Sequence, residues 1–108
     1  MNTTRAQGIQ GIEMTLPVGD KIKFRCYRQR FTIRARDERY AICTKPFNPK
    51  KTVMYTIVDL ERGVRGPEDL IFGRGVETDK ECNEMLQRLI SGESEVSYRH
   101  CINLDIES

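Results

Sequence analysis

Basic side chains at alternating positions are the residues of this 108-residue chain best suited to chemistry with a partner. Residues 1–54 carry twelve basic and four acidic side chains, a net charge of +8. Residues 55–108 carry six basic and twelve acidic side chains, a net charge of −6, so the overall charge of +2 hides the division. An asymmetry of this size predicts a basic surface region, and such regions attract phosphates or acidic proteins.

The basic residues lie in two segments that alternate with period two. In residues 21–26 the basic side chains share one parity and the apolar ones the other, as in a half-buried strand. Residues 30–36 repeat this pattern, with Phe31, Ile33 and Ala35 on the apolar face. If the two strands pair as a hairpin, one sheet face carries six cations: Lys21, Lys23, Arg25, Arg30, Arg34 and Arg36. Because like charges opposite each other cost stability, such a face either binds an anionic partner or protects an exposed sheet edge.

A second candidate contact element is the segment 46–51. Pro46 and Pro49 remove amide donors and fix their dihedral angles, which predicts an irregular loop. Phe47 lies between them and is either a rigid anchor for a partner or a lid that folds back on the core. With the turn residue Arg28, the predicted partner-binding set is Lys21, Lys23, Arg25, Arg28, Arg30, Arg34, Arg36, Phe47, Lys50 and Lys51.

A catalytic or metal-binding constellation is not indicated. The single histidine, His100, shares parity with Tyr98 and Ile102, which predicts a structural position within or beside a packed sheet face. The adjacent His100 and Cys101 would point to opposite faces of a strand. The chain has no CxxC pair, so we expect free thiols that are mostly buried, with no metal, cofactor or disulfide, at Cys26, Cys43, Cys82 and Cys101. We therefore expect a protein that is not an enzyme.

The elements that must position these residues are mostly strands. Strand patterns follow at 40–45, 53–60 and briefly 64–65, and a last alternation over 96–106 predicts one strand or two. One helix is predicted to begin at Thr78, because Thr78 and Glu81 form a capping box, and to end near Gly92. Its apolar stripe is Cys82, Met85, Leu86, Leu89 and Ile90.

This order of elements predicts an α+β fold. We expect a small bent antiparallel sheet, or an SH3-like partial barrel, of five to six strands with one amphipathic helix in the C-terminal half. Residues 1–15 are predicted to be a flexible tail and residues 16–108 a single domain.

Two resemblances add to this interpretation. The run Val18-Gly19-Asp20-Lys21-Ile22-Lys23-Phe24, followed by Phe31-Thr32-Ile33, resembles the first hairpin of SH3-like small barrels. The segments 40–48, 55–59, 65–73 and 91–97 together resemble small proteins encoded by bacteriophages and prophages of enteric bacteria. That resemblance implies a bacterial host cytoplasm and an accessory role in which the protein binds a host protein and modulates it.

The sequence therefore predicts a non-catalytic binding module whose partner is an acidic host protein. The alternative is an RNA- or DNA-binding small barrel that uses the same basic face, with Tyr27 or Phe47 as a stacking platform. The net charge of −6 on residues 55–108 disfavours a long polyanion. The chain contains no apolar run of membrane-spanning length and no signal-peptide pattern, so we expect a cytoplasmic protein without membrane contact. The oligomeric state stays open.

Overall fold

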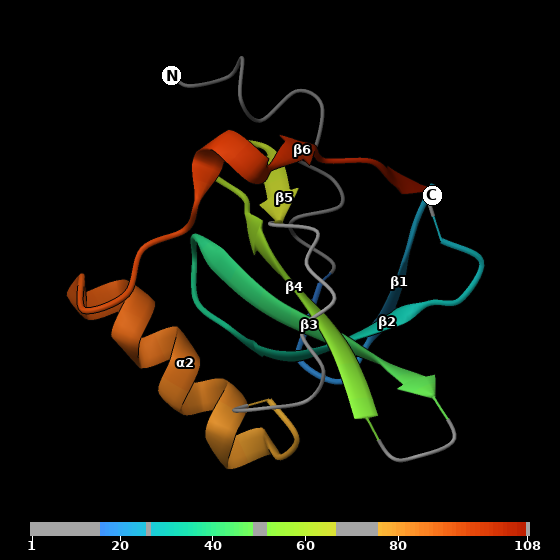
Figure 1. Cartoon of the computed structure of the whole chain (residues 1–108), viewed down its shortest axis with the longest axis horizontal. Coiled ribbons are helices and arrows are strands. Elements are labelled where there is room, and N and C mark those ends of the chain that lie inside the picture. The colour runs from blue at the N-terminus through green and yellow to red at the C-terminus, as the bar shows by residue number, and fades with distance from the viewer. Residues whose placement is uncertain (1–15, 26, 49–51, 67–75, 108) are drawn as a thin grey trace.

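Seven strands in the described residues form one antiparallel sheet in the computed structural model. The structure describes residues 16–25, 27–48, 52–66 and 76–107, and of Phe47, Asn48 and Thr52 it describes the backbone alone. The strands are β1 (Lys21–Phe24), β2 (Phe31–Arg36), β3 (Tyr40–Asn48), β4 (Thr52–Asp59), β5 (Val64–Gly66), β6 (Ile102–Asn103) and β7 (Ile106–Glu107). Their order across the sheet is β6-β5-β4-β3-β2-β1-β7. A helix, α2 (Asp79–Ser91), and a 3₁₀ turn, η1 (Tyr98–His100), complete the described elements (Figure 1).

The sheet is strongly curled, because its two outermost strands belong to one short segment. β6 pairs with β5 and β7 pairs with β1, and only Leu104 and Asp105 lie between β6 and β7. We call residues 102–107 the C-terminal strap. The Leu104 amide donates to the Gly63 carbonyl at 2.8 Å, and the Arg25 amide donates to the Asp105 carbonyl at 3.0 Å. The strap therefore joins the two sides of the sheet into a partial barrel.

Two apolar clusters cover the two faces of this sheet. The inner cluster fills the barrel and consists of Leu16, Ile22, Phe24, Phe31, Ile33, Ala41, Cys43, Met54, Val58 and Leu60. The outer cluster lies between the sheet and α2 and consists of Ala35, Ile42, Ile57, Val76, Cys82, Leu86, Leu89 and Val96. Neighbouring residues of β3 and β4 alternate between the clusters, as Ile57 and Val58 do. The central strands are therefore buried on both faces, as the low polar content of residues 53–60 predicts.

The helix begins and ends where local signals place it. Thr78 is the N-cap, and its hydroxyl accepts from the Glu81 amide while the Glu81 carboxylate accepts from the Thr78 amide. Gly92 closes the helix with φ of 85°, a left-handed conformation that favours glycine. One stripe residue was assigned wrongly: Ile90 is 47% exposed, because it lies at the margin of the buried stripe formed by Cys82, Leu86 and Leu89.

Three further predictions need correction or limits. The strand count is seven rather than five to six, because the C-terminal alternation breaks into η1 and two short strands. Residues 46–48 are not irregular, since β3 continues through Pro46 to Asn48 with a register shift between them. Proline is tolerated at such an irregularity in the ladder. The predicted tail, residues 1–15, lies outside the described residues. In the part of the chain that the structure describes, no helix has the length and apolarity needed to cross a membrane.

Candidate binding surface

A bulge in β2 divides the face on which six cations were expected. Ile33 pairs with Cys43 and Ala35 pairs with Ile42, so β2 contains one extra residue at Arg34. Beyond the bulge the parity is inverted. Ala35 faces the outer cluster and Arg36, opposite Ala41, lies on the inner side of the sheet. The prediction that all six cations share one face is therefore wrong.

Arg34 and Arg36 are also engaged in contacts within the fold. Arg34 Nε lies 2.8 Å from Oδ1 of Asp79 in the first turn of α2, and Arg34 Nη1 donates to the Thr44 hydroxyl at 3.2 Å. Arg36 Nη1 donates to the Leu16 carbonyl at 2.8 Å. Arg34 links α2 to the sheet, and Arg36 links Leu16 to β2. We therefore read both side chains as structural rather than as free cations for a partner.

The remaining hairpin cations lie at the start of β1 and in the β1–β2 loop. Lys21, Arg25, Arg28 and Arg30 are exposed, and none of them forms an ion pair with another residue that the structure describes. We call these four residues the basic end. Lys23 lies beside it and pairs with Glu107 at 3.2 Å. The β1–β2 loop that carries three of the four lies on the opposite side of the molecule from α2 (Figure 1).

A layer of aromatic rings and buried cations supports the basic end from within the barrel. Tyr27 packs edge-on against Phe31, with ring centroids 5.1 Å apart. The Lys45 ammonium lies 5.6 Å from the Tyr27 ring centre and donates to the Gln29 side chain at 3.3 Å. These contacts hold the loop to β3, because Tyr27 and Gln29 belong to the loop. The basic end is therefore carried on a well-packed support rather than on a loop without tertiary contacts.

Arg65 is the most deeply buried cation of this layer. Its side chain is fully buried and its guanidinium carbon lies 4.4 Å from the Phe24 ring centre, in cation–π geometry. Arg65 Nε and Nη2 bind the Asp105 carboxylate at 2.7 and 3.3 Å. This pair ties β5 to the C-terminal strap inside the barrel. Sequence reasoning missed Arg65 and Lys45, because their burial follows from strand pairing, such as that of Arg65 with Val58, and from contacts with distant residues.

The second predicted contact element is described only in part. Pro46 is exposed and follows Lys45 directly, so the start of segment 46–51 adjoins the β1–β2 loop through the Lys45–Gln29 hydrogen bond. The side chain of Phe47 and residues 49–51, which include Lys50 and Lys51, lie outside the described residues. Their part in binding stays a prediction.

A second arginine-rich region is organised around a buried carboxylate. Asp59 is fully buried and accepts from Arg39 Nε and Nη2 at 3.2 and 3.1 Å. It also accepts from the Tyr98 hydroxyl at 2.5 Å and from the amides of Glu61 and Arg62, both at 3.1 Å. The Arg62 guanidinium lies 3.9 Å from the Tyr98 ring centre. We call Arg39, Asp59, Arg62 and Tyr98 the arginine–tyrosine cluster.

Protonation in this cluster follows from its contacts. Burial alone would raise the pKa of Asp59, but the hydrogen bonds from Arg39, Tyr98 and the Arg62 amide outweigh it and lower that pKa. Burial, together with the hydrogen bond to Asp59, raises the pKa of Tyr98. The hydrogen bond to Asp59 raises the pKa of Arg39. Asp59 is therefore a carboxylate at neutral pH, with its charge satisfied by groups from the β2–β3 turn, the β4–β5 turn and η1.

The histidine and the described cysteines lie apart from any cluster of three metal-ligating side chains in the described residues. His100 lies in η1 and is exposed, so its expected place beside a packed sheet face is wrong. Its Nδ1 lies 3.0 Å from the Ser97 hydroxyl within the same turn. Cys43 and Cys82 are buried, and burial raises the pKa of the Cys43 thiol to about 12. Cys101 is half-buried, Cys26 lies outside the described residues, and the described residues contain no cluster of three metal-ligating side chains.

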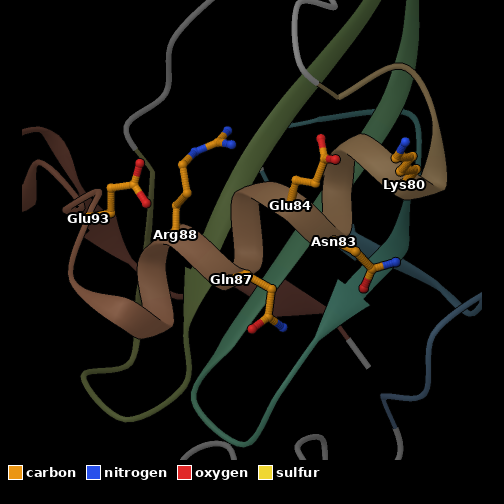
Figure 2. Close-up of a pocket in the computed structure, with 6 residues that line it drawn as sticks. All are labelled: Lys80, Asn83, Glu84, Gln87, Arg88 and Glu93. Atoms are coloured by element: carbon orange, nitrogen blue, oxygen red, sulfur yellow. The ribbon is translucent and has the colours of Figure 1, made fainter.

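The exposed face of α2 carries a shallow hollow of about 660 Å³. Its lining residues are Lys80, Asn83, Glu84, Gln87, Arg88 and Glu93. In Figure 2, Glu84 and Arg88 project from one side of the helix and Asn83 and Gln87 from the other. Its two cations and two carboxylates balance, so the hollow has no net charge and no apolar anchor. It does not compete with the basic end as a binding site for a charged partner.

Comparison of the chain with protein-family models, with curated proteins and with solved structures finds no match in any of the three. The function must therefore be argued from the geometry.

Proposed function

We propose that the protein is a non-catalytic binding module whose contact surface is the basic end and whose partner is an acidic protein. The observation that carries this proposal is the contrast in pairing. Lys21, Arg25, Arg28 and Arg30 are exposed and make no ion pair with described residues, whereas Arg34, Arg39 and Arg65 are each bound to a carboxylate. Grouped cations that the fold leaves unneutralised raise the local concentration of an anionic partner and orient it.

A protein partner fits this surface better than a nucleic acid does. Non-specific binding of single strands relies on exposed aromatic rings between the phosphate contacts. Near the basic end, Phe24 and Phe31 are fully buried, and Tyr27 is half-buried with its ring packed against Phe31 and the Lys45 ammonium. Among the described residues the basic end therefore has charge without a stacking platform. RNA or DNA binding by the same residues remains the alternative.

Two further assignments belong to this proposal. The segment 46–51, with Phe47, Lys50 and Lys51, is assigned to the contact surface as well, because Lys45, which directly precedes it, binds Gln29 of the β1–β2 loop. The resemblance to small phage and prophage proteins supports a bacterial cytoplasmic protein as the partner. The curled sheet with its strap supports classification as an SH3-like small barrel.

The proposal that the module is non-catalytic rests on the described side chains. The Ser97–His100 contact is the nearest approach to a nucleophile–base pair, and both residues are exposed within one turn. No described carboxylate is hydrogen-bonded to the His100 ring to orient it. A working nucleophile requires a base that is itself held in place.

The test is a pull-down from bacterial lysate with and without nuclease, comparing the wild type with Arg28→Glu/Arg30→Glu. The matched control is Lys80→Glu/Arg88→Glu on the exposed face of α2, which makes the same change in net charge at a different place. We expect a stoichiometric protein that survives nuclease, is lost from the first variant and is retained by the control. Equal loss from both variants would show attraction to net charge alone and would refute the assigned surface.

Salt dependence separates the two candidate partners. Nucleic-acid binding should weaken by roughly 0.7 to 0.9 log units per log unit of salt for each phosphate contacted. Nucleic acid recovered alone, and lost on nuclease treatment, would replace the protein partner by the alternative.

A further inference from the structure

The edge of β1 is only half covered by the C-terminal strap. β7 pairs with the second half of β1, where Glu107 stands opposite Lys23 and Ile106 opposite Phe24. The same register, continued along the strand, reaches Ile22 and then Lys21. These two residues pair with β2 on one side and have no strand partner on the other among the described residues. An unpaired strand edge is a template for a further extended segment.

The strap shows which side chains this edge accepts. Its apolar residues Leu104 and Ile106 pack against the inner cluster. Of its two acidic residues, Glu107 contacts β1, where it binds Lys23 at 3.2 Å, whereas Asp105 binds Arg65 of β5 at 2.7 Å. The edge therefore recognises an extended segment in which acidic and apolar side chains alternate.

β7 itself is weakly held. It is a two-residue strand in which Ile106 is only half-buried against the inner cluster, and the Lys23–Glu107 ion pair joins two side chains that are 30% and 44% exposed. Exposed ion pairs of this kind contribute little to stability. The tightly bound part of the strap is Asp105, which contacts the buried Arg65. β7 can therefore leave β1 while the Asp105 anchor stays in place.

We propose that the partner's contact element is an extended segment of alternating acidic and apolar residues that takes the place of β7 on β1. This inference rests on the proposed function, since it specifies how the acidic partner binds. The incoming segment pairs with all four residues of β1 rather than two, and its backbone supplies the affinity, as in strand addition to sheet edges. Its additional acidic residue meets Lys21.

The position of the basic end agrees with this mode of binding. The pairs Lys21–Thr32 and Ile22–Phe31, continued by one step, place Arg30 opposite Lys23. A segment lying along β1 therefore has Lys21, Lys23 and Arg30 on its outer side. β7 competes with the partner's segment for the same edge of β1. The stability of the β1–β7 pairing therefore sets the affinity for the partner.

A disulfide across the β1–β7 pair tests the inference in one protein. Lys23 and Glu107 are direct cross-strand partners, a spacing compatible with a disulfide, so Lys23→Cys/Glu107→Cys can be locked by oxidation and released by a reductant. The probe is a fluorescein-labelled peptide that repeats residues 106 and 107 and continues with isoleucine and glutamate, because residues 102–105 of the strap stay in place. Binding is measured by fluorescence anisotropy. A peptide with amides in place of the carboxylates is the control ligand, and wild type under both conditions is the control protein.

The reduced variant lacks Lys23 but keeps the β1 backbone and Lys21, so we expect it to bind the peptide. We expect the oxidised variant to bind about tenfold or more weakly, because affinity falls with the fraction of molecules whose β1 edge is open. Equal affinity in the two states, or no preference for the acidic peptide, would overturn the inference.

Should the double variant not fold, Glu107→Gln in the full chain must bind the peptide more tightly than the wild type does. An unchanged affinity there counts against the inference. Neither result depends on the lysate pull-down, so the proposed function and this inference can fail separately.

Discussion

The basic end and the arginine–tyrosine cluster contain the same kind of side chain in opposite states. In the cluster, Arg39 binds the buried Asp59 and Arg62 stacks on Tyr98. At the basic end, Arg25, Arg28 and Arg30 extend from a loop without a carboxylate partner among the described residues. The difference shows that the number of arginines does not identify a binding surface, since arginine side chains also form ion pairs and cation–π contacts that stabilise the fold. What identifies it is charge that the fold leaves unneutralised.

The largest expected effect comes from removing the centre of the cluster. Asp59→Ala should lower the free energy of unfolding by about 3 kcal/mol, because it leaves Arg39 and Tyr98 without their buried acceptor. Glu61→Ala is the matched control, since Glu61 also binds Arg39, at 3.1 Å, but is 61% exposed. We expect the control to change stability by less than about 0.5 kcal/mol in urea unfolding. Similar losses for the two variants would show that burial does not distinguish these carboxylates.

Acid should weaken the cluster without any mutation. The pKa of Asp59 is lower in the folded than in the unfolded protein, because the hydrogen bonds that lower it outweigh burial, which would raise it. Its contribution to stability is therefore present above the unfolded pKa and is lost as the pH falls through the folded one.

Urea midpoints measured between about pH 5 and about pH 2 should fall more for the wild type than for Asp59→Asn, which cannot titrate at this position. Parallel pH profiles for the two proteins would mean that Asp59 is not the group responsible.

The two regions also differ in how far the sequence could predict them. Local signals were sufficient for β1, β2, β4 and β5 and for the helix caps at Thr78 and Gly92, because period-two alternation and capping depend on near neighbours. They did not give the end of β3 or the division of the C-terminal pattern into η1, β6 and β7. The exposure of Lys21, Arg25, Arg28 and Arg30 agrees with the prediction that these side chains face outward.

Features that depend on distant segments could not be predicted in the same way. The extra residue at Arg34 is defined by its pairing with β3, and it moves Arg36 to the inner side of the sheet. The burial of Arg65 depends on Asp105, forty residues along the chain, and on the ring of Phe24. Asp59 and Tyr98 likewise meet only when η1 is placed beside the β4–β5 turn. In each case the alternation pattern predicts which face of a strand a side chain occupies, but not which distant residue it contacts.

The smallest expected effect is the one that tests the comparison most directly, because it concerns two arginines once expected on one face. Arg30→Glu should leave the free energy of unfolding unchanged within about 0.5 kcal/mol, since Arg30 is exposed and has no ion pair among the described residues. Arg34→Glu should cost about 1–2 kcal/mol, because it removes the bond to Thr44 and sets a carboxylate against Asp79. Urea unfolding of the two variants measures this difference. If Arg30→Glu lowers the free energy of unfolding as much as Arg34→Glu does, the side chains of the basic end form ion pairs that stabilise the fold. The basic end would then not be a surface of unpaired cations available to a partner.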